Sequence, residues 1–287
     1  MQLEIKNITK KYGSKKIGLS DYSLNITSGI LGLLGPNGAG KSTLIKIIST
    51  ISKPTDGTIY LNGNNILKKP NYIRKMLGYL PQDFGVYHNL NAYEFLAYIA
   101  AMKGIGGKGL HSRIEKLLEE VNLIEHAKNH LGTYSGGMIQ RIGIAQALLN
   151  DPKVIIFDEP TVGLDPEERL RFRDLLSDLA KDRIIILSSH IVSDIETIAD
   201  EVAIMKKGSL IVKGSQEDII NIADGKIFES IVEKSKINDF KRSHTIISSY
   251  RMQNEFRVRY IPGESYSDAK HNVPATLEDA YIYLTKN

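Results

Sequence analysis

The chain has 287 residues, 42% of them hydrophobic and 24% charged, with a net charge of +4 and no cysteine. Lysine and arginine are spread along the chain, so we expect no nucleic-acid partner, and the lack of cysteine excludes disulfides and thiolate metal sites. The charged residues among the first six do not fit the apolar core of a signal peptide, and no apolar run approaches the length of a membrane span.

The predicted elements begin with strands and a phosphate-binding loop. Alternating apolar residues predict strands within residues 3–8 and 22–26, and the apolar segment Ile30–Leu34 follows. It leads into the pattern G-x-x-x-x-G-K-[S/T], in which glycines let successive N–H groups turn inward toward an anion. A helix predicted over Ser42–Ile51 would add the positive end of its dipole. The phosphate loop consists of Gly35, Pro36, Asn37, Gly38, Ala39, Gly40, Lys41, Ser42 and Thr43.

This loop predicts the binding of a nucleoside triphosphate. Lys41 is expected to reach the β- and γ-phosphates, and the Ser42 hydroxyl is expected to be a ligand of Mg²⁺. The alternative is a glycine-rich loop without a ligand. The order of strand, loop and helix favours phosphate binding.

The rest of the first 216 residues alternates between helices and strands. Thr58–Leu61 predicts a strand, and helical periodicity extends from about 91 to 150. The apolar runs Val154–Phe157 and Ile184–Leu187 then predict strands that are buried on both faces of a parallel sheet. Residues 202–212 predict a closing hairpin.

Two acids, Asp158 and Glu159, follow the predicted strand Val154–Phe157. The carboxyl ends of parallel strands meet at one edge of a sheet, so these acids should lie near the phosphate loop. Neighbouring side chains on a strand diverge, so their roles can differ. We predict that Asp158 holds Mg²⁺ and that Glu159 is the general base toward the attacking water. The alternative, that both acids only cap the next turn, is disfavoured by the phosphate loop upstream.

The composition divides the chain into two predicted domains. Residues 1–216 contain the nucleotide site, with a helical subdomain at about 84–150, and residues 217–287 form a small α+β accessory domain. Apolar and basic residues alternate over 256–260, as in a half-buried strand. Thr276 is the predicted N-cap of the last helix. The accessory domain has no recognisable catalytic group of residues.

The segment Tyr134–Met138 reads YSGGM and resembles the LSGGQ signature of ATP-binding cassette (ABC) proteins. The chain is therefore similar to the ATP-binding subunit of an ABC transporter over about residues 1–216, and Ala275–Tyr281 resembles the last helix of exporter-type (ABC-2-like) cassettes. The resemblance implies an α/β fold: a P-loop NTPase cassette with a parallel-sheet core, an antiparallel β subdomain and a helical subdomain. Further motifs in the family's order are the adenine-stacking aromatic Tyr12, the Q-loop glutamine Gln82, the D-loop aspartate Asp165 and the switch histidine His190.

The resemblance also implies how these residues act. Two cassettes pair head to tail, so Ser135, Gly136 and Gly137 would bind the γ-phosphate of the partner's ATP, and Asp165 would cross the interface. His190 would contact the γ-phosphate of the chain's own ATP and position the attacking water together with the general base.

Gln82 is implied to sense Mg²⁺ and the attacking water. Tyr134 and Met138 replace the Leu and Gln of the family signature, while its Ser-Gly-Gly centre is intact. This departure suggests altered interface contacts and not a loss of the anion site.

The resemblance implies a partnership with a separate membrane permease, hence a cytoplasmic location on the inner face of the cell membrane. We expect a homodimer, with an unequal heterodimer as the alternative, and export is favoured over import. The run Phe84–Tyr87 either packs in the core or forms a groove for the permease. Two other functions are disfavoured. A soluble ABC protein that acts on ribosomes or DNA usually carries two fused cassettes or a coiled-coil insertion, and a cassette that binds ATP without turnover is not expected to keep Asp158, Glu159 and His190.

Overall fold

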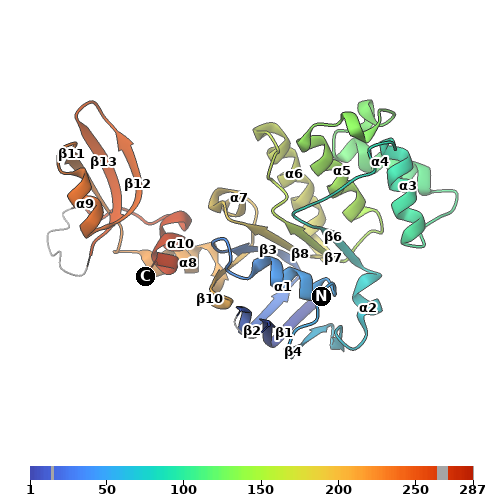
Figure 1. Cartoon of the computed structure of the whole chain (residues 1–287), viewed down its shortest axis with the longest axis horizontal. Coiled ribbons are helices and arrows are strands. Elements are labelled where there is room, and N and C mark those ends of the chain that lie inside the picture. Colours follow the sequence, from blue (N-terminus) through green and yellow to red (C-terminus); the bar gives the residue numbers. More distant parts are fainter. Residues whose placement is uncertain (14–15, 264–270, 287) are drawn as a thin grey trace. The chain divides into compact units, whose positions relative to one another are not determined.

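The computed structural model describes residues 1–13, 16–263 and 271–286. The chain divides into two compact units, residues 1–210 and 211–287 (Figure 1). None of the helices in the described ranges has the length and apolarity that a membrane span requires.

The first unit begins with an antiparallel sheet whose strand order is β2-β1-β4-β5. Inward-facing residues alternate with outward-facing ones; Leu3, Ile5 and Ile8 are buried on β1. This alternation is what a sheet with one solvated face requires. The strands are β1 (Gln2–Tyr12), β2 (Lys16–Thr27), β4 (Asp56–Leu61) and β5 (Asn64–Asn65).

The second sheet of this unit has the order β10-β9-β3-β8-β7-β6, and β9, β3, β8, β7 and β6 run parallel. All residues of β7 and β8 are buried, which confirms the predicted parallel-sheet core. Their Ile and Val side chains suit strands that are covered on both faces. The strands are β3 (Gly29–Leu34), β6 (Leu77–Leu80), β7 (Val154–Asp158), β8 (Ile184–Ser189), β9 (Glu201–Lys206) and β10 (Ser209–Ser215).

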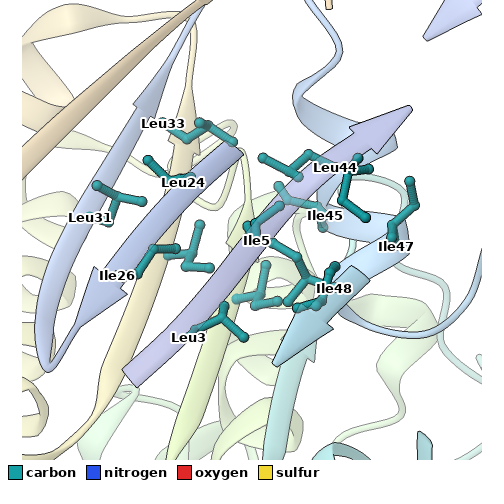
Figure 2. Close-up of a cluster of buried hydrophobic side chains, with 14 of the residues drawn as sticks. Leu3, Ile5, Leu24, Ile26, Leu31, Leu33, Leu44, Ile45, Ile47 and Ile48 are labelled. Atoms are coloured by element: carbon teal, nitrogen blue, oxygen red, sulfur yellow. The ribbon is translucent and has the colours of Figure 1, made fainter. Parts of the chain in front are cut away.

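Helix α1 (Lys41–Ile48) lies in the core of the first unit (Figure 2). Its residues Leu44, Ile45 and Ile48 pack in one cluster with apolar side chains from β1, β2 and β3. Burying one such side chain stabilises the fold by about 1.5–3 kcal/mol. The predicted helix end at Ile51 was wrong. Thr50 takes a positive φ of 61°, which ends the helix, and the N–H groups of residues 51 and 52 return to the carbonyl of Lys46.

The predicted helical segment within about 91–150 contains three α-helices. The first of them starts at a capping box, in which Asn91 accepts from the Glu94 N–H and the Glu94 side chain accepts from the Asn91 N–H. The helices of this segment are α3 (Ala92–Met102), α4 (Leu110–Glu120), η1 (Ile124–His126), η2 (Leu131–Thr133) and α5 (Gly136–Leu148). The remaining helices of the first unit are α2 (Pro70–Arg74), α6 (Pro166–Leu179), η3 (Ala180–Asp182) and α7 (Val192–Glu196).

The second unit is built around an antiparallel sheet with the order β11-β13-β12. One face of this sheet forms a small core with α9, in which Val232, Ile237, Val258 and Tyr260 are buried. The elements are α8 (Gln216–Ala223), β11 (Phe228–Glu233), α9 (Ile237–Ser243), β12 (Thr245–Arg251), β13 (Glu255–Ile261) and α10 (Leu277–Lys286).

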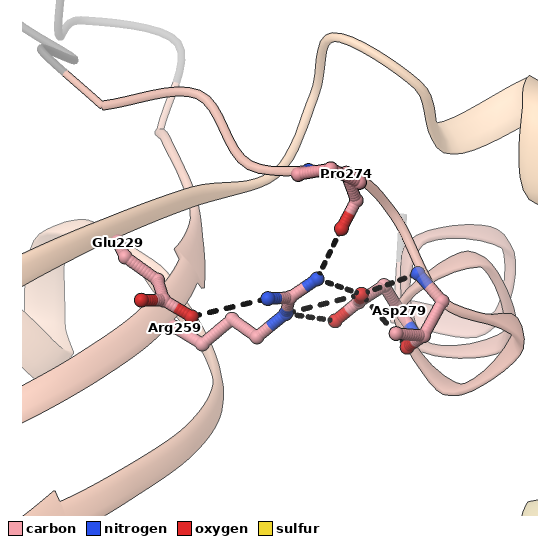
Figure 3. A network of polar contacts seen from close by, with 5 residues as sticks. Glu229, Arg259, Pro274 and Asp279 are labelled. Carbon is pink, nitrogen blue, oxygen red and sulfur yellow. Dashed lines mark hydrogen bonds and ion pairs between the residues drawn. The ribbon is translucent and has the colours of Figure 1, made fainter.

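A polar network ties α10 to this sheet (Figure 3). The guanidinium of Arg259 donates to both carboxylate oxygens of Asp279, at 2.9 Å from Nε and 2.6 Å from Nη2, and to Glu229 Oε1 at 3.1 Å. It also donates to the carbonyl of Pro274 at 2.5 Å. The predicted N-cap Thr276 is confirmed, since its hydroxyl accepts from the Asp279 N–H at 3.3 Å.

Candidate nucleotide-binding site

The predicted site residues meet because four parallel strands end at the same edge of the central sheet. In register, Leu34 of β3 lies opposite Ser189 of β8, and Asp158 of β7 lies opposite Ser188. The phosphate loop, the acids and the switch histidine all follow directly from these ends. This edge is where open parallel sheets place their ligands.

The phosphate loop leads into α1 through Gly40, which has a φ of 106° and lies at the helix N-terminus. A Cβ on Gly40 would lie 2.7 Å from the carbonyl oxygen of Gly18, so only glycine fits. The amine of Lys41 is buried and donates to the carbonyl of Gly35 at 2.5 Å. Burial lowers the pKa of Lys41, although the charges of Glu159 and Asp158 oppose that shift.

A cavity of about 580 Å³ opens over this loop. Tyr12 at its rim is 42% exposed, and its hydroxyl lies 3.4 Å from Thr43 Oγ1. Sequence reasoning missed Lys16, Ile17 and Gly18; the only signal was a glycine inside a strand, which often marks close approach of another group. A Cβ on Gly18 would lie 2.7 Å from the Tyr12 ring. The lining residues are Tyr12, Lys16, Ile17, Gly18, Pro36, Asn37, Gly38, Ala39, Gly40, Lys41, Ser42, Thr43, Gln82 and Glu159.

The two acids after β7 have different surroundings. Asp158 is buried and accepts from the hydroxyl of Ser188 at 2.6 Å. Burial raises the pKa of Asp158, and hydrogen bonds from Ser188 and Ser42 oppose that rise. Glu159 turns away with a φ of 54°, and its N–H donates to the carbonyl and hydroxyl oxygens of Ser188. Sequence reasoning gave Ser188 no role of its own.

Glu159 lies between two other predicted residues. Its Oε1 is 3.2 Å from Nδ1 of His190, and its Oε2 accepts from Nε2 of Gln82 at 3.4 Å. Glu159 and Gln82 both line the cavity beside Lys41. A carboxylate, an amide and an imidazole therefore converge beside the phosphate loop. These groups can bind and orient a water molecule and accept its proton.

Seven predicted site residues are not among the described residues that line this cavity. Three of them lie next to it: Gly35 directly precedes Pro36, Asp158 directly precedes Glu159, and His190 contacts Glu159. The other four are Ser135, Gly136, Gly137 and Asp165. Ser135 is the N-cap of α5, which begins with Gly136 and Gly137, and its hydroxyl accepts from the backbone N–H of Met138 at 3.3 Å. Asp165 is the N-cap of α6, and its side chain accepts from the backbone N–H of Glu168 at 2.9 Å.

The signature and the D-loop lie against each other. A Cβ on Gly137 would lie 2.9 Å from the carbonyl oxygen of Gly163. The departures from the family signature fit this local structure. Met138 donates its backbone N–H to the Ser135 hydroxyl, a contact that does not depend on the type of side chain at 138. Tyr134 is buried, and its hydroxyl donates to the carbonyl of His126 at 2.9 Å.

The residues beside the phosphate loop also fit a magnesium ion. The Ser42 hydroxyl acts on the Asp158 carboxylate and opposes the rise of its pKa, so two hard oxygen donors belong to the same neighbourhood. Among the residues that the structure describes, no group of three or more histidines, cysteines or acids could hold a metal by itself. Mg²⁺ suits such a place because it takes one or two protein oxygens and completes its shell with phosphate and water oxygens.

Comparison with known proteins confirms the family. The family model described as ABC transporter matches residues 19–162. The chain belongs to the ABC transporter family. It is 34% identical to the ABC transporter ATP-binding protein YxlF of Bacillus subtilis, over 88% of this chain and 83% of YxlF. It is 36% identical to the bacitracin transport ATP-binding protein BcrA of Enterococcus faecalis, over 81% of this chain and 78% of BcrA.

Among solved structures, the fold is similar to a dimeric ATP-binding cassette in a post-hydrolysis state with ADP and Pi bound. The TM-score is 0.68 at 27% identity, over 74% of this chain and 98% of that one. The predicted cassette fold and the predicted ATP hydrolase class are thus confirmed: this chain is an ATP-binding, ATP-hydrolysing transport ATPase.

Proposed function

We propose that this chain is the ATPase subunit of a membrane exporter and hydrolyses Mg-ATP at the interface of a head-to-tail dimer. The observation that carries this proposal is the position of Glu159, between Gln82 and His190 at the cavity of the phosphate loop. An ATP γ-phosphate beside Lys41 would place the attacking water within reach of this carboxylate.

Each residue of the site has its own role in ATP binding or hydrolysis. The phosphate loop and Lys41 bind the β- and γ-phosphates, and Tyr12 stacks on the adenine. Glu159 takes the proton of the attacking water as the water oxygen bonds to the γ-phosphorus and the bond to the ADP oxygen breaks. Gln82 and His190, which flank this carboxylate, hold the water in line. Removing such a base costs about 10²–10⁴ in rate.

Ser42, Asp158 and Gln82 are the proposed binding residues for Mg²⁺, which when bound neutralises charge that develops on the phosphate oxygens. The influence of Ser42 on the pKa of Asp158 supports a shared site for these two oxygen donors. Burial outweighs the hydroxyls of Ser188 and Ser42 and the charge of Lys41, so the pKa of Asp158 is raised and its ionised form is not fully compensated. A cation at this place would supply the missing counter-charge.

The proposed dimer follows from the separation of the signature from the chain's own cavity. Ser135 and Gly137 begin a helix of 13 residues, whose N-terminus attracts anions. They do not line the cavity of their own chain. In a head-to-tail dimer they would bind the γ-phosphate of the partner's ATP, with Asp165 next to them. A homodimer needs only this chain.

The proposed permease contact lies on the helical segment. Phe84 packs edge-on against Phe95, at 6.1 Å between ring centres, whereas Tyr87 is exposed and pairs with Tyr98 at 5.4 Å. Two exposed aromatic rings suit a docking surface for a partner helix, because aromatic residues contribute much of the binding energy at protein interfaces. Export is supported by the names of relatives, which include bacitracin transport BcrA and the linearmycin resistance protein LnrL of Bacillus subtilis.

The first experiment replaces the proposed base by its isosteric amide. We expect Glu159→Gln to keep ATP binding, to lower turnover by about 10²–10⁴, and to form an ATP-dependent dimer by light scattering. A Glu159→Gln protein that hydrolyses ATP like the parent would show that another group is the base. A variant that binds ATP and stays monomeric would overturn the shared interface.

A pull-down of the tagged chain from detergent-solubilised membranes of its host tests the partner. A stoichiometric multi-span protein supports the transporter proposal, and deleting its gene should reveal the cargo. Recovery of ribosomal proteins or nucleic acid instead would assign the ATPase to a different assembly.

A further inference from the structure

A polar network outside the cavity centres on Asp194 of α7. The side chain of Asp194 is only 7% exposed. Its Oδ2 accepts from the hydroxyl of Thr161 at 2.6 Å, and its Oδ1 is 3.3 Å from Nη1 of Arg169. Arg169 also donates from Nε to the carbonyl of Leu164 at 3.2 Å. None of these four residues is among those that line the cavity.

The network joins α7, which follows the switch histidine, to α6 and to the segment between β7 and α6 that carries Glu159 and Asp165. Thr161 follows the general base Glu159 by two positions, and Leu164 directly precedes Asp165. Asp194 follows His190 by four positions. The segment between the base and Asp165 is folded into turns, in which the N–H of Leu164 donates to the carbonyl of Thr161 at 3.2 Å. Asp194 therefore binds this segment directly at Thr161 and, through Arg169 of α6, at Leu164.

The same network reaches the signature. A Cβ on Gly137 would lie 2.9 Å from the carbonyl oxygen of Gly163 and 3.9 Å from Cδ2 of Leu164. The backbone at 163–164 thus supports the start of α5. Arg169 donates to the Leu164 carbonyl. A displacement of this backbone would therefore disturb both the start of α5, at Gly137, and the Arg169 side chain that contacts Asp194.

We propose that Asp194 is a positioning residue that couples a cassette's own hydrolytic group, Glu159 and His190, to the signature and D-loop surface that it offers to its partner. The physical reason is that one carboxylate on α7 binds a donor from the segment after Glu159, Thr161, and a donor from α6, Arg169. If α7 moved without that segment and α6, a nearly buried charge would lose its partners, which is costly. These three parts of the cassette are therefore expected to move together when the dimer closes. This inference rests on the function proposed above.

Substitutions that preserve shape test the coupling. We expect Asp194→Asn and Thr161→Val to lower kcat by about tenfold or more, because small displacements of reacting groups have effects of this size. The KM for ATP should stay within about twofold of the parent, the range of an ordinary surface change. Thr161→Ser, which keeps the hydroxyl, should restore kcat. The control Asp174→Asn removes an aspartate of α6 that is 71% exposed and should change neither constant.

A second measurement uses the dimer. In the Glu159→Gln background, adding Asp194→Asn should weaken ATP-dependent dimerisation while ATP binding by the monomer is retained. The proposal is overturned if Asp194→Asn and Thr161→Val turn over ATP like the parent, or if KM rises in step with the loss of kcat, which would indicate general damage to the fold. If Glu159→Gln itself remains active, the proposed base fails first; if only the Asp194 and Thr161 variants are normal, the coupling alone fails.

Discussion

Asp158 in the first unit and Asp279 in the second are both buried aspartates, and their surroundings shift their pKa values in opposite directions. Asp158 is held by the hydroxyls of Ser188 and Ser42, and burial raises its pKa. For Asp279 burial acts in the same direction, but Arg259 and Thr276 outweigh it and the pKa is lowered. A carboxylate that already has its counter-charge serves the fold. One that is held by hydroxyls, with the charge of Lys41 too weak to offset its burial, can bind a cation.

The largest effect that we expect from this contrast is on the second unit. Arg259→Met would leave Asp279 buried without its guanidinium, and removing one partner of a buried ion pair costs about 3–5 kcal/mol. Denaturant unfolding or hydrogen exchange of β11–β13 measures this loss, and ATP affinity should be unchanged. Arg257→Met on the same strand is the control, since Arg257 is exposed. Equal losses in the two variants would contradict a special role for the Asp279 pair.

In the first unit, removing a buried charge beside the phosphate loop should weaken ATP binding and not the stability of the fold. We expect Lys41→Ala to weaken ATP binding by about 2–5 kcal/mol, because a buried charge contact to phosphate is lost. Lys46→Ala, at an exposed position of the same helix, should bind ATP like the parent. Calorimetric titration gives both affinities. An unchanged affinity of Lys41→Ala would remove this lysine from the site.

A smaller effect is expected at the rim of the cavity. Tyr12→Ala should weaken ATP binding by about 1–3 kcal/mol, the usual contribution of one aromatic stacked on a base. Tyr12→Phe keeps the ring and should retain the parent affinity. If Tyr12→Phe is as weak as Tyr12→Ala, the contact of the Tyr12 hydroxyl with Thr43 matters more than the stack.

The smallest effect is a pair of opposite pH dependences in the nucleotide-free protein. The folded pKa of Asp279 is below the ordinary value of 3.8, so its contribution to stability is present above that pH and is lost as the pH falls below it. The folded pKa of Asp158 is above 3.8, so ionising it costs stability as the pH rises from that value. For each of Asp158→Asn and Asp279→Asn, the difference in unfolding free energy from the parent can be measured across pH. The two differences should change with pH in opposite directions. Parallel curves would refute the contrast.

The elements whose signals lie in consecutive residues could be predicted. The phosphate loop, the strands ending at Asp158, the strand over 256–260 and the cap at Thr276 depend on local spacing and on the period of burial. The end of α1 could not be predicted, because it depends on the positive φ of Thr50, and threonine seldom takes that conformation. Asp279 was also missed as a buried group. Charged residues are usually exposed, so a buried one is recognised only when its partner is known. The partner of Asp279 is Arg259, which lies 20 positions away in the sequence.

The cassette family, the residues of the phosphate loop and the acids Asp158 and Glu159 were predictable from the order of the amino acids, because each motif is a short run whose chemistry is set by neighbouring residues. The contacts of Ser188 with Asp158 and of Asp194 with Thr161 and Arg169, across 25 to 33 positions of chain, are visible only in the folded chain. Those contacts depend on which strands pair, in which register, and where the following loops fold. They come from packing between distant segments, which no local pattern records.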